Sequence, residues 1–416
     1  MTALALTGRL MAPAGIVDPG VLEIRHDGTI GYVGPASGWS GPAPEPVDTV
    51  APGYIDIHCH GGGGHTVTSA DPAAVEAVAT HHLSRGTTTM LASLVSASRA
   101  ELVAGIASIA SVAATGSSVV GCHIEGPFLD PGHRGAHNPG ELRLPDSDEV
   151  AAWLAAGVDD AGVQRVRMVT LAPELPGAVE AVEVLEHSGV VVGMGHTGAD
   201  ARAFAEALRS VPRPLVTHLF NGMEPLHHRR PGPVAASLDA LALGATHVEL
   251  IADGVHVADE TVHLVFAVDP GQHVVLVSDA MAAAGMPDGD FDLGSVAVRV
   301  ERGRAWTRTE PPVLAGGTSH AADLVRRCVA HAGVDPGAAV AAATSTPAAM
   351  LGLDDRGSLA TGLRADLVVL DPDWRVRRVM RAGDWVRSED TSDPASAASE
   401  DASDRASANS EAPQRD

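Results

Sequence analysis

The sequence alternates short apolar runs with longer stretches in which apolar residues recur at helical spacing. Apolar runs that end in glycine or a polar turn predict strands at residues 54–60, 87–95, 119–125, 166–172, 190–196, 215–219, 247–252 and 274–279. Helical patterns lie between them, for example at residues 72–84, 99–114, 199–208 and 321–331. Eight strands that alternate with helices predict an α/β fold, a (β/α)8 TIM-like barrel over residues 51–345.

The two ends of the chain have a different pattern, typical of short strands and turns. Residues 4–10, 21–25 and 29–33 read as strands, and Asp27-Gly28 is a hairpin signal. Strand patterns return at 365–371 and 376–380. Neither end is long enough to fold alone, so we predict one small β-sandwich domain built from residues 1–50 and 346–387. Residues 388–416 carry eight acids and two arginines and are predicted to be a disordered acidic tail.

Composition narrows the possible environments and partners. Aromatic residues make up only 3% of the 416 residues, so the core must depend on Val, Leu, Ala and Ile. A net charge of -24 argues against nucleic acid or an anionic membrane as partner. No run approaches the roughly 18 apolar residues of a membrane span. Three cysteines, an odd number, do not form a set of disulfide pairs, which favours a reducing, cytoplasmic location.

All 28 basic residues are arginine. High-GC codon usage is a sufficient explanation, but the chemical consequence holds in any case. Without lysine the chain has no Schiff base, no lysine general base and no carbamylated-lysine bridge between metal ions.

The residues with the strongest chemical signal sit where predicted barrel strands end. His58 and His60 are two apart and therefore share one face of a strand. Loops at the carboxyl ends of barrel strands carry the active site, so side chains from different strands meet there. The sequence thus predicts a metal site. The candidate ligands are His58, His60, Glu125, His196 and His218, with Asp279 beside them.

Imidazole and carboxylate ligands suit Zn²⁺, Fe²⁺, Mn²⁺ or Co²⁺, and the sequence does not rank these ions. One or two ions are possible, because Glu125 could bridge a pair made by His58 and His60 to a pair made by His196 and His218. A bound cation that activates water suggests hydrolysis, with Asp279 as the catalytic acid and base. Cys59 points to the opposite face and is expected to pack. His81, His82, His187, His263 and His331 lie on helix patterns and are not counted as ligands.

Several motifs resemble the N-acetylglucosamine-6-phosphate deacetylase family of the amidohydrolase superfamily over about residues 1–387. They are DIHCHGGGGH at 56–65, HIEGPF at 123–128, GAHNP at 135–139, GHT at 195–197, HLFNGM at 218–223 and SDAMAAAG at 278–285. The resemblance implies hydrolysis of the acetamide of N-acetylglucosamine 6-phosphate to glucosamine 6-phosphate and acetate. It matches Glu125, His196 and His218 to the main metal ligands and Asp279 to the acid/base. His58 and His60 match a pair that permits a second metal in some members.

The resemblance also implies substrate contacts and a homodimer. His137 matches a contact to the sugar or the amide oxygen, and Leu314 a segment that lines the acetyl pocket. Matches to phosphate contacts, some of which the family takes from a neighbouring subunit, are Asn221, Gly222, Arg229 and His256. Ser278 and Gly222 depart from the family's commoner Thr and Ala. Residues 129–134 are expected to cover the site.

An anion pocket also follows from charge alone. Residues 227–230, His-His-Arg-Arg, form the densest cationic cluster of an acidic chain, and guanidinium binds phosphate well. Two other functions stay open at this point. One is a different amidohydrolase, such as an N-acyl-amino-acid deacylase or a cyclic-amide hydrolase. The other is a non-catalytic binding protein on the same barrel.

Overall fold

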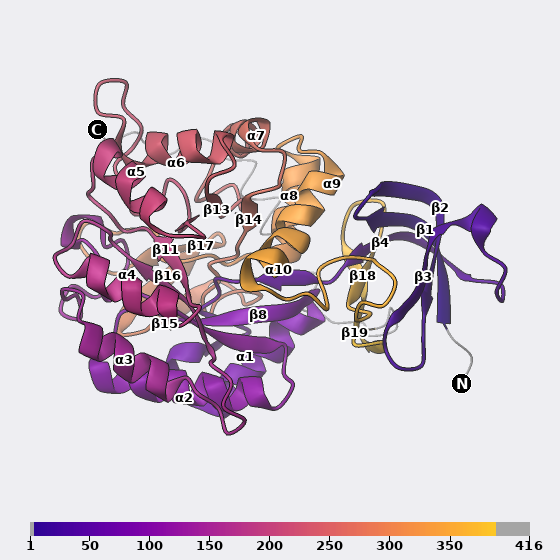
Figure 1. The fold of residues 1–416 in the computed structure, drawn as a ribbon, viewed down its shortest axis with the longest axis horizontal. Coiled ribbons are helices and arrows are strands. Elements are labelled where there is room, and N and C mark those ends of the chain that lie inside the picture. The colour runs from indigo at the N-terminus through magenta and orange to yellow at the C-terminus, as the bar shows by residue number, and fades with distance from the viewer. Residues whose placement is uncertain (1–3, 388–416) are drawn as a thin grey trace.

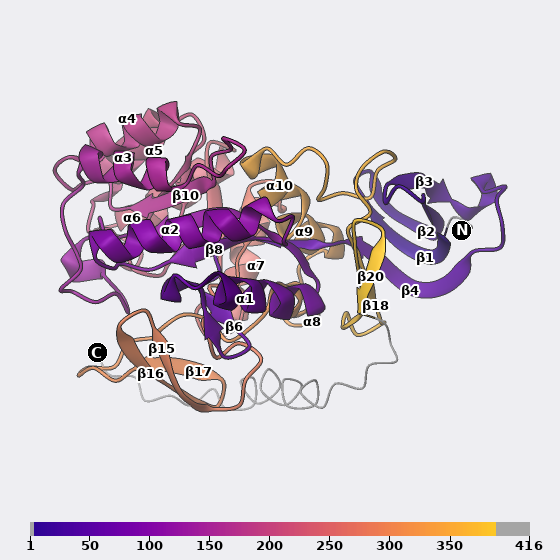
Figure 2. The same cartoon turned by 90° about the horizontal axis from the view of Figure 1, so that it is seen from below.

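The structure is a computed structural model and describes residues 4–387. The predicted acidic tail at 388–416 lies outside the described residues. Figures 1 and 2 show a barrel flanked at one side by a β domain that contains the first and the last strands of the described chain. Within residues 4–387, no helix is both long enough and apolar enough to cross a membrane.

The barrel is an eight-stranded sheet whose neighbouring strands are parallel, in the order β14-β13-β12-β11-β10-β9-β8-β5. The (β/α)8 prediction is confirmed. Contacts between the loops beyond β5 and β14 close the ring, since Asp279 N donates to His58 O over 2.9 Å and His60 N to Ala280 O over 2.8 Å. The strands are β5 (Tyr54–Asp56), β8 (Thr87–Leu94), β9 (Val119–Glu125), β10 (Val166–Leu171), β11 (Val191–Met194), β12 (Leu215–Val216), β13 (His247–Leu250) and β14 (Val274–Leu276).

Helices cover the outside of the barrel, and local capping explains where they begin. Ser98 and Glu101 form a reciprocal capping box at the start of α2. The helix predicted from residue 199 begins two residues later, because Asp200 is the N-cap and its side chain accepts from Ala203 N. The helices are α1 (Pro72–Ser84), α2 (Arg99–Ala114), α3 (Ser147–Ala156), α4 (Ala178–His187), α5 (Ala201–Ser210), α6 (Gly232–Ala242), α7 (Asp259–Val268), α8 (Ala321–Ala330), α9 (Pro336–Ala342) and α10 (Ser345–Leu351).

Several barrel strands end earlier than their apolar runs predict, and for three of them (β11, β12 and β14) the backbone gives the reason. The backbone leaves the extended conformation and becomes left-handed at His196 (φ 49°), His218 (φ 25°) and Asp279 (φ 48°). Non-glycine residues adopt this conformation at a cost, and such strain concentrates at functional sites. Strand pairing therefore stops just before each of these side chains.

The β domain is confirmed as a product of both chain ends, but its hydrogen-bonded strands form one mixed sheet rather than two stacked sheets. The order is β20-β19-β18-β4-β1-β2-β3, so strands from the carboxyl end pair with β4. Apolar side chains from both ends, including Leu6, Leu22 and Leu367, share one core. The strands are β1 (Leu4–Ala12), β2 (Gly15–Ile24), β3 (Ile30–Pro35), β4 (Glu45–Pro52), β18 (Leu367–Leu370), β19 (Val376–Arg381) and β20 (Asp384–Arg387).

Two small sheets were not predicted. A three-stranded antiparallel sheet, β15 (Gly289–Leu293), β16 (Val296–Glu301) and β17 (Arg304–Thr307), follows the barrel's last strand and stands at its edge (Figure 2). A two-stranded ribbon, β6 (Gly61–Gly62) and β7 (His65–Thr66), follows the predicted ligand pair His58 and His60. Val296, Val298 and Val300 occupy every second position, a strand pattern that could have predicted β16. Of these three side chains, Val298 and Val300 face a core.

Candidate metal and substrate site

Nitrogen and oxygen atoms of the predicted ligands converge at the carboxyl ends of the barrel strands. The Nε2 atoms of His58 and His60 lie 3.1 Å apart, and those of His196 and His218 lie 3.0 Å apart. Glu125 stands between the pairs. Its Oε1 is 3.0 Å from Nε2 of both His196 and His218. Its Oε2 is 3.2 Å from Nε2 of His60 and 3.5 Å from that of His58. Each carboxylate oxygen thus faces one histidine pair.

The Nδ1 atoms of His60 and His196 show which tautomer each of these two rings adopts. His60 Nδ1 is 2.8 Å from the carbonyl oxygen of Ser93, and His196 Nδ1 is 2.8 Å from that of His133. A carbonyl only accepts, so each Nδ1 carries the proton and each Nε2 turns its lone pair toward Glu125. A nitrogen lone pair and a carboxylate oxygen repel each other unless a positive charge lies between them. A further proton on the ring or a bound cation supplies that charge. The donor set therefore fits a divalent cation.

Asp279 extends this cluster toward the cavity. Its Oδ1 lies 3.2 Å from Nε2 of His60 and 3.6 Å from Nε2 of His58. Burial alone would raise the pKa of Asp279. When His58 and His60 carry the further proton, the hydrogen bond from His60 and the charges of both rings lower the pKa of Asp279 to about 2. The side chain is therefore an ionised carboxylate at neutral pH.

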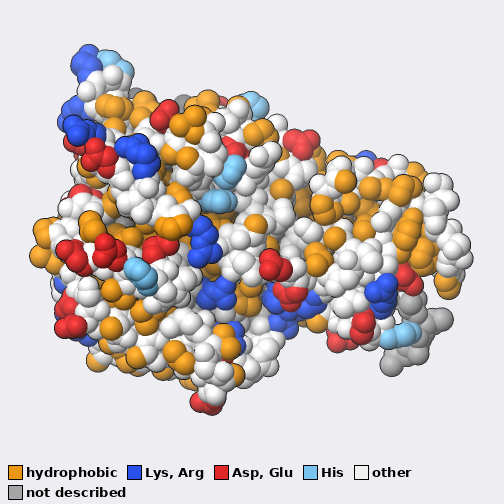
Figure 3. Space-filling view, in the orientation of Figure 1, with side chains coloured by type: hydrophobic (Ala, Val, Ile, Leu, Met, Phe, Trp, Pro, Cys, Tyr) orange, Lys and Arg blue, Asp and Glu red, His pale blue; other side chains and the backbone are white. Residues whose placement is uncertain are grey.

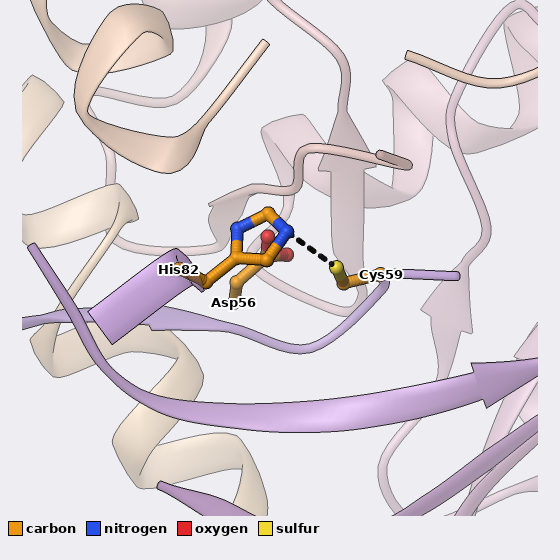
Figure 4. Close-up of side chains that lie close together, drawn as sticks. All are labelled: Asp56, Cys59 and His82. Atoms are coloured by element: carbon orange, nitrogen blue, oxygen red, sulfur yellow. Dashed lines mark hydrogen bonds between the residues drawn. The ribbon is translucent and has the colours of Figure 1, made fainter. Parts of the chain in front are cut away.

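Behind these ligands, a second group of buried side chains holds the segment that carries them. Figure 4 shows the ring of His82 facing Cys59, with Nε2 3.3 Å from Sγ. The same Nε2 lies 2.9 Å from the carbonyl oxygen of Gly61. Asp56 accepts from Ser278 Oγ over 2.5 Å and from the backbone N–H of His58 over 3.3 Å. Asp56, Cys59 and His82 include metal-ligand types, but their contacts are structural. Asp56 ties the ends of β5 and β14 together, and His82 ties α1 to the segment after β5.

A cavity of about 220 Å³ opens beside Glu125 and Asp279. Five of the six predicted substrate contacts line it: His137, Asn221, Gly222, His256 and Leu314. The sixth, Arg229, does not. It lies in the exposed turn between β12 and α6, and its guanidinium contacts His228 Nε2 over 2.7 Å. Figure 3 shows Arg and His side chains gathered on a protrusion at the upper left.

His137 is prepared to donate a hydrogen bond into the cavity. The backbone N–H of Ser96 donates to His137 Nδ1 over 3.3 Å, and Ser96 Oγ lies 2.8 Å from the same atom. An Nδ1 that accepts from the backbone leaves the ring proton on Nε2. Burial lowers the pKa of His137 and outweighs the opposing effect of Glu125, so the ring is neutral. Its Nε2 lies 3.3 Å from Glu125 Oε2.

His256 is a cavity side chain whose surroundings favour its cationic form. Its Nδ1 is 2.8 Å from Oδ2 of Asp253, and both side chains are buried. Burial alone would lower the pKa of His256, but the charge and the hydrogen bond of Asp253, together with the charge of Asp279, raise it above its usual range. Asp253 was not predicted. Its position three residues before His256 was the only sequence signal.

Other site residues also escaped prediction. Leu293, Ser295 and Val296 of the β15–β16 hairpin line the cavity. Asn138 Nδ2 donates to Ser295 Oγ over 2.9 Å and joins this hairpin to the segment that carries His137. Glu249, on β13, contacts the ring of His58. It was visible in the sequence as a single carboxylate within the apolar run 247–252.

A parallel barrel with histidines and carboxylates gathered at its carboxyl rim defines a class of hydrolases that act with a bound metal. Comparison with known proteins makes the assignment specific, since the model of the amidohydrolase family matches residues 49–386. The chain belongs to the amidohydrolase family. It is a hydrolase that acts on carbon–nitrogen bonds, and the non-catalytic alternative is wrong.

Three of the relatives are deacetylases of 6-phosphorylated N-acetylhexosamines, and two of these three carry the name that the motifs predicted. The chain is 34% identical over 391 residues to the N-acetylgalactosamine-6-phosphate deacetylase of Escherichia coli O157:H7, covering 92% of this chain and 99% of that one. It is 34% identical over 354 residues to the N-acetylglucosamine-6-phosphate deacetylase of Bos taurus, covering 83% and 85%. A solved structure of the Mycobacterium smegmatis N-acetyl-D-glucosamine-6-phosphate deacetylase, a mutant in complex with N-acetyl-D-glucosamine-6-phosphate, matches with a TM-score of 0.86 and 36% identity, covering 93% and 100%.

Proposed function

We propose that this protein removes the acetyl group of N-acetylglucosamine 6-phosphate and releases glucosamine 6-phosphate and acetate. The observation that carries the proposal is the pairing of each Glu125 oxygen with one histidine pair, beside an ionised Asp279. The names of the relatives supply the substrate class. They favour it over N-acyl-amino-acid deacylases and cyclic-amide hydrolases.

The residues that would hold a divalent cation fall into two sets. Glu125 Oε1, His196 and His218 form one set, and Glu125 Oε2 with His58 and His60 forms the other. We propose that one or two ions of Zn, Fe, Mn or Co bind here. A bound cation lowers the pKa of a water molecule and polarises a carbonyl group.

Asp279 would move the proton in this reaction. Its carboxylate is ionised at neutral pH and 13% exposed, so it faces both the ligands and the cavity. We propose that it accepts a proton from the attacking water and delivers it to the amide nitrogen as the carbon–nitrogen bond breaks. The Nε2 proton of His137 would hold the amide oxygen or a sugar hydroxyl. Leu314 would line the acetyl pocket.

The phosphate would be bound by the cationic part of the cavity. His256 is favoured in its imidazolium form, and Asn221 and Gly222 line the same cavity. Arg229 lies outside the cavity of its own chain. We therefore propose a homodimer in which Arg229 completes the site of the neighbouring subunit. Free, buried cysteines at 59, 122 and 328 support a cytoplasmic location.

An acetate-release assay tests the function. The metal-loaded protein is incubated with the 6-phosphates of N-acetylglucosamine and N-acetylgalactosamine, before and after chelation and after metal is added back. We expect release of acetate and free amine, loss of turnover on chelation and recovery on add-back. The faster of the two substrates identifies the preferred epimer. The proposal would be refuted if the protein released acetate from neither of the two sugar phosphates.

A further inference from the structure

Glu249 is a fully buried carboxylate that contacts two of the proposed histidine ligands, His58 and His218. It belongs to β13, where its neighbours Val248 and Leu250 are apolar and equally buried. A buried carboxylate is costly unless hydrogen bonds and positive charge compensate it. Its contacts therefore indicate why the chain places a charge there.

One oxygen of Glu249 contacts both histidine pairs. His58 Nδ1 donates to Oε2 over 3.0 Å, and the backbone N–H of His218 donates to the same atom over 3.1 Å. Among residues 4–387, no side chain or backbone group hydrogen-bonds to the other oxygen, Oε1. The carboxylate thus fixes the ring of His58 and the strand end at His218.

His58 differs from the other ligands in the charge of its partner. His60 and His196 donate their Nδ1 protons to neutral carbonyl groups, whereas His58 donates to a carboxylate. A carboxylate partner makes a stronger hydrogen bond and increases the basicity of the coordinating nitrogen. Nε2 of His58 is therefore the most strongly electron-donating of these three atoms.

The number of carboxylates around the histidine ligands also favours a second cation. Carboxylates that contact the histidine rings are Glu125, Asp279 and Glu249. With neutral rings, one divalent cation leaves one of the three negative charges uncompensated, and two divalent cations compensate all of them. A second cation at His58 and His60 gives buried Glu249 the positive charge that it otherwise lacks.

We infer that Glu249 is a positioning residue that holds His58 as a ligand and makes His58, His60 and Glu125 a site for a second cation. The inference rests on the metal dependence in the proposed function. It goes further because it assigns an occupancy of two and names the residue responsible.

The test measures metal binding rather than turnover. Metal-free protein is titrated with Co²⁺, followed by visible absorption and by metal content after gel filtration. Wild-type protein should bind two ions per subunit. Glu249→Gln keeps an oxygen that accepts from His58 but loses the charge, so one ion should bind ~10-fold more weakly. Glu249→Leu loses both, so the same ion should bind ~100-fold more weakly. The other ion should weaken less, because His218 loses only the acceptor of its backbone N–H.

Two further variants identify the ion and control for stability. His58→Asn should weaken the same ion, and adding Glu249→Leu to it should weaken that ion no further, because Glu249 acts through His58. Glu149→Gln is the matched control, because Glu149 is also buried and pairs with Arg143, and neither residue lines the cavity. It should bind two Co²⁺ ions with wild-type constants. Because Gln has the size and shape of Glu, Glu249→Gln remains informative if the Leu variant does not fold.

Three results would overturn the inference: a wild-type protein that binds a single ion, unchanged constants in Glu249→Gln and Glu249→Leu, or equal weakening of both ions. A wild-type protein that binds no Co²⁺ would contradict the proposed function itself. The two failures are therefore distinguishable.

Discussion

Removing the charge of Asp253 should selectively weaken binding of a phosphorylated substrate. In Asp253→Asn, the amide oxygen can still accept from the backbone N–H groups of Val255 and His256, which Oδ1 now holds at 2.8 Å each. The amide nitrogen would face His256 Nδ1, so the ring loses its counter-charge and becomes neutral. The fold should survive, and the cavity should lose its cation.

The magnitude follows from the contact that is lost. Asp253 and His256 form a hydrogen bond of 2.8 Å between side chains that are 5% and 6% exposed. Without this partner the ring loses its charge, and with it the charge-assisted hydrogen bond from the imidazolium to the phosphate. Such a bond contributes about 1.5–3 kcal/mol, which corresponds to roughly 10- to 150-fold in KM. Because the contact is made to a remote phosphate, kcat should change little.

The pH dependence has a definite sign. Asp253 and Asp279 face His256 and raise its pKa, so wild-type imidazolium persists to higher pH than that of a free histidine. KM for the phosphorylated sugar should rise as pH increases through this raised pKa. In Asp253→Asn the same rise should occur at lower pH.

The assay compares KM for N-acetylglucosamine 6-phosphate with KM for N-acetylglucosamine between pH 5.5 and about 9, the range in which histidine titrates when its pKa is raised. Asp269→Asn is a matched control, since Asp269 contacts His273 Nδ1 over 2.7 Å and does not line the cavity. It should leave both constants unchanged. An equal rise in KM for both sugars, or no rise, would refute the role of Asp253.

Two further substitutions test the proton carrier and the proposed dimer. Asp279→Asn should lower kcat by ~10²- to 10⁴-fold while elemental analysis finds metal content close to wild type; wild-type activity would exclude Asp279 as the acid/base. Arg229→Ala should raise KM for the phosphorylated sugar alone, and mixing it with Asp279→Asn subunits should restore activity, because each hybrid dimer has one site with both residues. If the mixture stays inactive although subunits exchange, Arg229 does not serve the neighbouring subunit.

Much of the fold follows from local sequence signals. β9 spans the predicted 119–125 because an apolar run, interrupted by His123, ends at Glu125-Gly126. The first two helices match their predicted ranges because Asp71 with Pro72, and Ser98 with Glu101, fix their starts locally. Such signals need no knowledge of distant contacts.

Other features depend on contacts that no local pattern contains. β11, β12 and β14 stop short because the backbone turns left-handed at the residues predicted to close them, although the apolar runs continue. Glu249 meets His58 across 191 positions, so its role becomes visible only when the barrel closes. Arg229 follows a predicted strand, yet its turn projects away from the cavity. Sequence position alone could not show that direction.

The most direct test of the central claim is a crystal structure of the Co²⁺-loaded protein with anomalous diffraction measured at the cobalt edge. We predict one peak between Glu125 Oε1, His196 and His218 and a second between Glu125 Oε2, His58 and His60. Peaks elsewhere in the molecule, with none beside Glu125, would contradict the account.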